Sequence, residues 1–246
     1  MPNLREMKAP DASLNRHVRP QTSWQLFAAA DRYFGSAERP FKFTVEAYYK
    51  WLRHVNPYSI DNVRVRYEAH NRARGYAAGV DFKLHGQLVE GAESWATLSI
   101  MQTREDLYDD GHGSIPRPTD QRVQFSSVLQ DNMPGNKSVT AMLSLFFGSG
   151  LPFGPQGCER WQATSRMPGY KRVDLGLYKD FAISPSDGAP KRQNLRSAKL
   201  GLEVFNLFDF SNTISYFWVS DNDGHQFGVP NYLTSRRLNV KLNIEF

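Results

Sequence analysis

The sequence predicts an all-β protein built as an antiparallel meander of the transmembrane β-barrel type. Apolar and polar residues alternate with a period of two along most of the chain, whereas helical 3.6-residue spacing is almost absent. The mean hydropathy is −0.54 although 13% of the residues are aromatic, a combination that suits strands with one lipid-facing and one hydrated face. No run of about 18 apolar residues exists, so the sequence excludes transmembrane helices.

The end of the chain shows this alternation most clearly. Leu238, Val240, Leu242, Ile244 and Phe246 are apolar, and the residues between them are polar. Successive side chains of a strand point to opposite faces, so this segment has one apolar and one hydrated face. Similar patterns predict about nine strands in all. The predicted strands cover residues 24–34, 41–51, 76–84, 96–100, 123–129, 139–147, 173–178, 199–219 and 238–246.

The stretch from Lys199 to Val219 is predicted to be one long strand rather than two. Its apolar residues fall on even positions, interrupted only by Asn206 and Asn212. A turn at Asp209 would be expected to disturb that phase, because a slip of one residue moves every side chain to the other face.

The predicted connections alternate in length. Short ones lie near residues 35–39, 86–93 and 131–136, a medium one near 184–196, and long ones near 53–74, 103–120, 149–169 and 220–234. Outer-membrane barrels have short periplasmic turns and longer extracellular loops. The order therefore predicts that the long connections are extracellular and that the last strand ends at the periplasmic face.

Aromatic residues fall near both predicted rims of the barrel. Amphipathic rings prefer these interfacial depths, where one side of the ring meets hydrated headgroups. The predicted outer rim carries Trp24, Trp51 and Trp218, and the inner rim carries Phe34, Phe41, Phe181 and Phe246.

The first residues predict a different organisation from the rest. Residues 1–22 are expected to form an extracellular loop or an irregular segment, and residues 23–246 the barrel strands. The N-terminus has no apolar core region and no small-residue cleavage site, so it is not a secretory signal. For an outer-membrane protein, this predicts that the chain is a piece of something larger.

Composition and motifs exclude several classes of function. The net charge of +5 comes from scattered Lys and Arg without a basic run, which indicates a mildly basic surface and no nucleic-acid partner. The single cysteine, Cys158, excludes an intrachain disulfide. The six histidines show no paired metal spacing, and Asp221–Gly224 and Asp109–His112 lack the later ligands of a calcium loop. No catalytic arrangement, cofactor site or metal site is predicted, so an enzyme is not expected.

Several segments carry a resemblance to a known family. The ending Tyr232–Phe246 resembles the last strand of TonB-dependent outer-membrane receptors, and Leu202-Glu-Val-Phe-Asn-Leu-Phe-Asp209 is similar to their "V-x-N-L-F-D/N" segment. Gly148-Ser-Gly-Leu-Pro-Phe153 followed by Gly169-Tyr-Lys-Arg-Val-Asp174 resembles the preceding strand–loop–strand pattern, particularly in Bacteroidetes-type receptors. These motifs cover about the last hundred residues. The resemblance implies about nine C-terminal strands of a barrel of about 22 strands.

The resemblance also implies a function for the parent receptor. Such receptors take up siderophores, cobalamin, or oligosaccharides and peptides across the outer membrane of Gram-negative bacteria, using energy delivered by TonB to a plug domain. This sequence shows neither a plug nor a TonB-binding segment, so TonB and the plug are expected as partners only in the full-length parent. Two alternatives remain open: a small stand-alone outer-membrane barrel, and a soluble β-sandwich acting as a binding module.

Two sets of functional residues follow from the resemblance. The outer-membrane assembly machinery is expected to read Leu238, Val240, Leu242, Ile244 and Phe246, which also face the membrane lipid. Ligand contacts are expected from aromatic and polar residues of the long loops. These candidates are Tyr58, Tyr108, His112, Arg160, Trp161, His225 and Tyr232.

Overall fold

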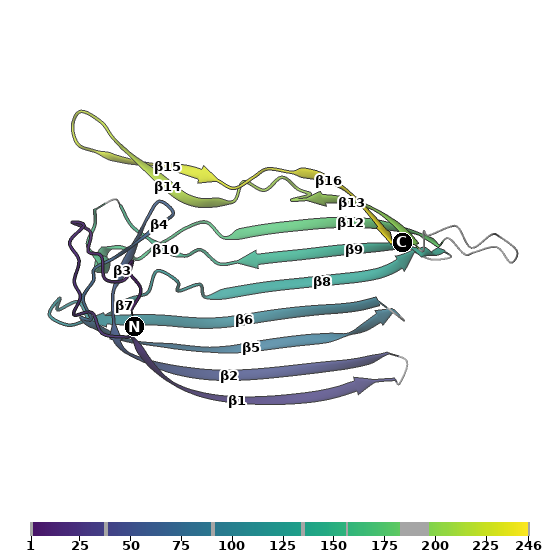
Figure 1. Ribbon diagram of the computed structural model, residues 1–246, viewed down its shortest axis with the longest axis horizontal. Helices are drawn as coiled ribbons and strands as arrows, with labels where there is room; N and C mark the ends of the chain where they lie inside the picture. Colours follow the sequence, from purple (N-terminus) through teal and green to yellow (C-terminus); the bar gives the residue numbers. More distant parts are fainter. Residues whose placement is uncertain are drawn as a thin grey trace, which may run out of the picture.

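The computed structural model describes residues 2–36, 39–89, 92–133, 136–155, 157–182 and 197–245. Their main feature is one antiparallel sheet in which strands adjacent along the meander are paired (Figure 1). Phe246 and residues 184–196, which the sequence analysis assigned to an inner-rim position and a medium connection, lie outside the described residues. The strands, in sheet order, are β1 (Thr22–Gly35), β2 (Pro40–Val55), β5 (Ala73–Val89), β6 (Ala92–Leu107), β8 (Val123–Met133), β9 (Asn136–Gly148), β12 (Tyr170–Ala182), β13 (Ser197–Phe205) and β16 (Arg237–Glu245).

The predicted meander is therefore confirmed, and so is the alternation of connection lengths. The connections after β1, β5 and β8 are tight, whereas those after β2, β6, β9 and β13 are long and carry their own small elements. All four long connections gather at one end of the sheet, at the left of Figure 1. We call this the loop end, and the opposite end the turn end.

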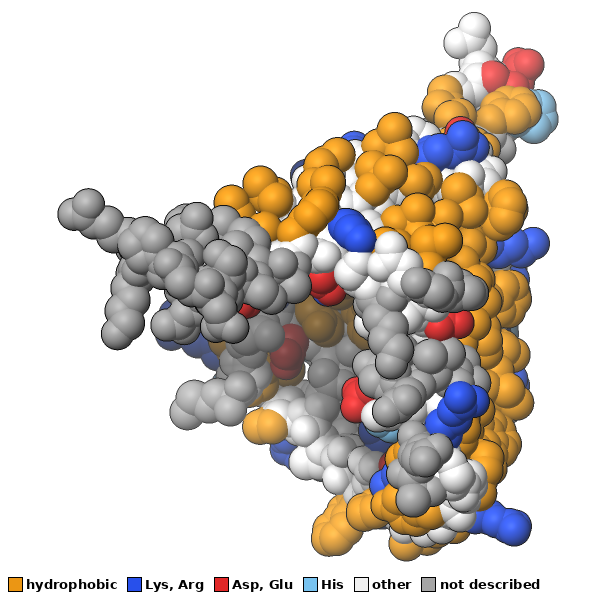
Figure 2. All heavy atoms as spheres, turned by 90° about the vertical axis from the view of Figure 1, so that its right-hand side faces the viewer, with side chains coloured by type: hydrophobic (Ala, Val, Ile, Leu, Met, Phe, Trp, Pro, Cys, Tyr) orange, Lys and Arg blue, Asp and Glu red, His pale blue; other side chains and the backbone are white. Residues whose placement is uncertain are grey.

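The register brings alternate apolar residues of neighbouring strands onto one face. Trp24 lies opposite Trp51, which lies opposite Tyr76 on the next strand. On the far side of the sheet, Leu202 lies opposite Val240. Figure 2 shows hydrophobic side chains covering the outer surface of the curved sheet. Because a strand turns successive side chains to opposite faces, the inner face receives the polar set.

Charged and hydroxyl side chains line that inner face. Lys42 forms an ion pair of 2.9 Å with Asp31 on the neighbouring strand, and Thr44 donates a 2.7 Å hydrogen bond to the same carboxylate. Asn239 similarly donates to Glu203 at 2.7 Å. An apolar outer face and a hydrated inner face are the arrangement of a membrane barrel wall.

The aromatic rims agree with the prediction at both ends, with one exception. Trp24 and Trp51 lie at the loop end of β1 and β2, and Phe34 stacks on Phe41 at the turn end with ring centroids 5.5 Å apart. Trp218 belongs instead to β14 (Thr213–Ser220), which pairs with β15 (Gln226–Tyr232) in a separate hairpin. Its assignment to the barrel rim was wrong.

The same finding corrects the long strand predicted over residues 199–219. β13 ends at Phe205, and Asn206 takes a left-handed backbone conformation with φ 53°. The Asn206 side chain accepts a hydrogen bond from the Phe210 backbone N–H and donates one to the Phe210 carbonyl, both at 3.0 Å. Its own backbone N–H donates to Asp174 at 2.8 Å. Asn is one of the few residues that adopts this conformation readily, so it ends the strand and starts a loop.

We expect Asn206→Ala to lower the free energy of unfolding by on the order of 2–3 kcal/mol, because it removes two hydrogen bonds and leaves a β-carbon at positive φ. Asn206→Gly removes the same hydrogen bonds but tolerates the backbone angle, so its loss should be smaller. Urea titration of both variants in lipid vesicles measures the difference. Equal losses would show that the backbone angle carries no energetic weight here.

Candidate ligand-binding surface at the loop end

The long connections form a packed layer over the loop end of the sheet. The connection after β2 forms the hairpin of β3 (Tyr58–Asp61) and β4 (Arg64–Tyr67), and the connection after β6 contains β7 (Ser114–Pro116). The connection after β9 contains β10 (Pro152–Phe153), the short helix η1 (Arg160–Gln162) and β11 (Ser165–Arg166). The buried apolar cluster of the described residues lies here, in Val55, Ala73, Leu107 and Ile115.

Glu105, near the loop end of β6, anchors two loops through arginines. Its carboxylate is fully buried and accepts hydrogen bonds from Arg160 at 2.7 Å and from Arg117 at 3.1 Å. Arg160 is itself buried, and it also donates to the Pro116 carbonyl at 3.0 Å. A buried carboxylate is stable only when paired in this way. Glu105 therefore fastens the connection after β9 to the connection after β6.

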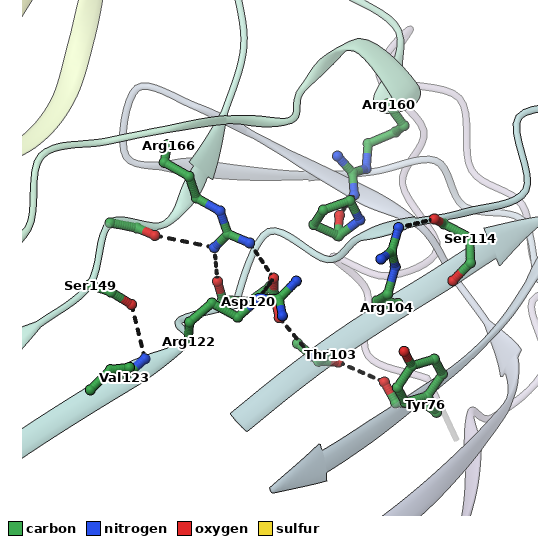
Figure 3. A network of polar contacts seen from close by, with 12 residues as sticks. Tyr76, Thr103, Arg104, Ser114, Asp120, Arg122, Val123, Ser149, Arg160 and Arg166 are labelled. Carbon is green, nitrogen blue, oxygen red and sulfur yellow. Dashed lines mark hydrogen bonds and ion pairs between the residues drawn. The ribbon is translucent and has the colours of Figure 1, made fainter. Parts of the chain in front are cut away.

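Asp120 forms a second anchor of the same kind (Figure 3). It is fully buried and accepts hydrogen bonds from the Thr103 backbone N–H at 2.7 Å and from Arg122 at 2.8 Å. Arg166 completes the set by binding both the carboxylate and the backbone carbonyl of Asp120. Two carboxylates and four arginines thus hold the loops in a fixed arrangement, which is what a preformed binding surface requires.

A cleft of about 350 Å³ opens between the four long connections, those after β2, β6, β9 and β13. Phe153 and Tyr216 stack in its wall with ring centroids 4.9 Å apart, and Trp218 lies beside Tyr216. Asp61 and Arg66 of the β3–β4 hairpin form a 2.7 Å ion pair in the lining. Aromatic walls with a few polar groups are typical of small-molecule sites of this size.

The structure brings some predicted ligand contacts into or near this layer. Arg160 lines the cleft, although its guanidinium is committed to Glu105. His112 and Trp161 stack with ring centroids 4.0 Å apart, which joins two loops at the surface. Tyr58 packs against Tyr67 across the β3–β4 hairpin, with the Arg117 guanidinium 6.0 Å from its ring centre.

Of the seven predicted contacts, Arg160 alone belongs to the cleft lining, and the remaining three lie elsewhere. Tyr108 is exposed and belongs to a groove on the outer face of the sheet. Tyr232 ends β15 opposite Thr213, and His225 lies at the tip of the β14–β15 hairpin. Whether any of the seven contacts a ligand stays a prediction.

Sequence reasoning missed the residues that shape the cleft. Ser215, which is buried, hydrogen-bonds to Asn62 and accepts a hydrogen bond from Asn231 at 3.2 Å, so it links the β3–β4 hairpin to the β14–β15 hairpin. The one sequence signal was the pair of asparagines, Asn206 and Asn212, that interrupt the apolar pattern. The Asn212 side chain accepts a hydrogen bond from the Lys171 backbone N–H and donates one to the Lys171 carbonyl, each at 2.8 Å.

The hairpin tip has the hydrogen bonding of a polar turn. Asp221 accepts backbone hydrogen bonds from His225 at 2.8 Å and from Asp223 at 3.0 Å. These hydrogen bonds, with that from the His225 backbone first, lower the pKa of the Asp221 carboxyl. Asp221, Asp223 and His225 bring possible metal-ligand atoms within 4.8 Å of one another, but all three are exposed. Their contacts are those of a polar turn, in keeping with the missing calcium ligands of Asp221–Gly224.

The sheet and its loop layer define the class of the fold as an antiparallel membrane-type β-barrel wall, closed over at one end by long loops. The solved structure of the ferric-catecholate import receptor Fiu from Escherichia coli K12 is similar to this chain, with a TM-score of 0.62 and 14% identity. The match covers 97% of this chain and 31% of the Fiu chain. The chain therefore has the fold of a portion of that receptor.

Comparisons of the sequence with protein families and with curated proteins found no match. No protein-family model matches the sequence, and no curated protein matches it. Within the described residues, no helix is long and apolar enough to cross a membrane.

Proposed function

We propose that this chain forms part of the barrel of a TonB-dependent outer-membrane receptor that takes up a bulky nutrient. The observation that carries the proposal is the register, which places apolar side chains of all nine meander strands on the outer face and polar ones inside. Lipid accepts only a wall whose backbone is hydrogen-bonded and whose outer face is apolar. The similarity to Fiu supports the receptor type, and the motifs in residues 148–209 support the family, including the Bacteroidetes-type pattern.

The loop layer supports the receptor part of the proposal. The cleft with Phe153, Tyr216 and Trp218 is a rigid aromatic surface at the end that the loop lengths assign to the cell exterior. We assign the first contact with the transported nutrient to it, with siderophores, cobalamin, oligosaccharides and peptides as the ligand classes. TonB and the plug domain are partners of the full-length receptor, as in the family.

The outer face of β16 is the segment that we assign to the assembly machinery. Leu238, Val240, Leu242 and Ile244 are exposed by 74%, 69%, 60% and 46%. Within the described residues β16 pairs only with β13, so its other edge offers backbone groups for pairing. Phe246 belongs to the same proposal from its place in the sequence.

The single cysteine gives a direct test of this membrane topology. Cys158 lies in the connection after β9, at the loop end. We expect a membrane-impermeant maleimide to label it on intact Gram-negative cells that secrete the chain to the outer membrane. Burial raises the pKa of the Cys158 thiol, so the reaction should be followed at mildly alkaline pH, where more thiolate forms.

The matched control moves the cysteine to the turn end. In a Cys158→Ser background, Ser36→Cys places a thiol in the tight connection after β1. That variant should react only after the outer membrane is permeabilised. Recovery of the chain in the soluble fraction, or labelling of both variants on intact cells, would contradict the proposed topology and favour a soluble sandwich.

A further inference from the structure

A groove of about 490 Å³ lies at the loop end of the sheet, separate from the cleft. Its lining includes Tyr49, Trp51 and Arg53 of β2 and Tyr76 of β5. Tyr49, Trp51 and Arg53 are alternate residues of one strand, so they share a face. That face also carries Trp24, because Trp24 lies opposite Trp51. The groove is therefore on the outer, lipid-facing side of the wall.

The floor of the groove is a packed set of aromatic rings. Tyr49 and Trp51 have ring centroids 4.5 Å apart, and Tyr49 stacks on Tyr76 at 5.7 Å with an interplanar angle of 9°. Below the rings, towards the turn end, the register places Ala78 opposite Tyr49 and Ala28 opposite Ala47. Small side chains at these positions leave less apolar bulk directly under the aromatic rim, and we call them the alanine path.

Basic side chains stand at the upper edge of the same groove. Arg53 is exposed and has no hydrogen bond or ion pair within the described part of the chain. The Arg74 side chain is 67% exposed and pairs with Asp106 at 2.8 Å. Arg104 lies opposite Tyr76 but is not part of the groove lining, and its guanidinium donates a hydrogen bond to the Ser114 carbonyl. In the lining, Arg53 and Arg74 face one carboxylate, that of Asp106, which leaves a positive surface beside an apolar one.

We propose that this groove binds an anionic lipid of the surrounding membrane through the phosphate of its headgroup. The inference rests on the proposed membrane location. The guanidinium group of Arg53 suits bidentate recognition of phosphate oxygens, and Arg74, whose Nε and one terminal nitrogen donate to Asp106, adds its other terminal nitrogen as a donor. Both side chains stand just above the aromatic rim, at the depth of lipid headgroups. The alanine path below accommodates an acyl chain. The phosphate-binding arginines and the apolar surface below them together match the two parts of a lipid, its headgroup and its acyl chain.

Flotation with lipid vesicles tests this assignment. The protein, refolded from detergent, is offered vesicles of phosphatidylcholine alone or of phosphatidylcholine mixed with phosphatidylglycerol. We expect a clear preference for the anionic vesicles. The double variant Arg53→Gln/Arg74→Gln should lose about fivefold of that preference per arginine, hence on the order of 25-fold in total.

A charge-matched control removes two outward-facing cations at the turn end, through Arg32→Gln/Lys179→Gln. Arg32 lies opposite Phe43 and Lys179 opposite Leu200, both on the outer face. This control removes the same charge at the other rim, where the groove does not adjoin it, so it should lose clearly less of the preference for anionic vesicles than the groove variant does. Equal losses in the two double variants would overturn the groove assignment and leave only a general charge effect.

Two further results separate the remaining explanations. Inorganic phosphate shares the chemistry of the headgroup phosphate, so it should reduce binding to anionic vesicles more than sodium chloride of equal ionic strength does. A reduction no greater than that by sodium chloride would overturn the phosphate contact and leave only a general charge effect. Binding to both vesicle types without preference would overturn the groove proposal alone. Absence of binding to either type would overturn the proposed membrane location, and the groove proposal with it.

Discussion

Glu105→Gln is expected to detach the connection after β9 from the sheet. The substitution removes a buried negative charge and leaves Arg117 and Arg160 without their counter-ion, and the side chains of these arginines are only 16% and 8% exposed. Removing one partner of a buried ion pair costs about 3–5 kcal/mol, because the remaining charge stays desolvated. That cost exceeds the free energy that keeps a surface loop packed, so this loop should open.

Two measurements can detect the opening of this connection. Trypsin should cleave after Arg160 and Arg166 much faster than in the unmodified protein, and Cys158 should react faster with a maleimide, since it leaves its partly buried environment. The sheet itself should stay folded, because its strands are paired independently of Glu105. Retained heat-dependent gel mobility in detergent would verify this.

Asp106→Asn is the matched control on the neighbouring residue. Asp106 also pairs with an arginine, Arg74, but that arginine is 67% exposed. Exposed pairs contribute about 0–1 kcal/mol, so trypsin cleavage and Cys158 reactivity should barely change. If Asp106→Asn opened the loop as much as Glu105→Gln, burial would not be the source of the anchor's strength.

The meander could be predicted from the sequence because its signal is local. Each strand is indicated by alternation over a few residues, as in Leu238–Ile244, and each connection by its length. The prediction failed after Val204 for a physical reason. The β14–β15 hairpin has two faces of its own, so Ile214 and Trp218 kept the even phase by coincidence, and the phase carried no information about strand continuity. The better sequence signal for the end of the strand was the asparagine at position 206, whose backbone is left-handed in the structure.

The loop layer could not be predicted in the same way, because its contacts join residues far apart in the chain. Arg160 and Glu105 are separated by 55 positions, and Ser215 and Asn62 by 153. No local pattern pairs such residues. Arg160 was therefore recognised only as a polar loop residue suited to a ligand, while Glu105 and Asp120, which position it and its neighbours, gave no motif.

Leu98→Arg and Ser99→Arg, on consecutive residues of β6, should have sharply different effects. Leu98 lies opposite Phe82 and Phe125 on the outer face, midway along the strand. An arginine at the midplane of the lipid face costs about 2–4 kcal/mol, because the guanidinium must be desolvated or the bilayer deformed. Ser99 turns the other way and lies opposite Asp81, whose Oδ1 is buried without a hydrogen-bond partner among the described residues.

An arginine at position 99 would lie on the inner face beside the Asp81 carboxylate of the neighbouring strand, so we expect its effect to stay within about 1 kcal/mol. Urea unfolding of both variants in lipid vesicles, followed by tryptophan fluorescence, measures the two free energies. The contrast is informative because the two residues are adjacent on one strand and occupy opposite faces of the sheet. In a soluble sandwich the exposed face would meet water, and Leu98→Arg would then be the milder change. A loss at Leu98 that matched or fell below the loss at Ser99 would therefore remove the main support for a lipid-facing outer surface.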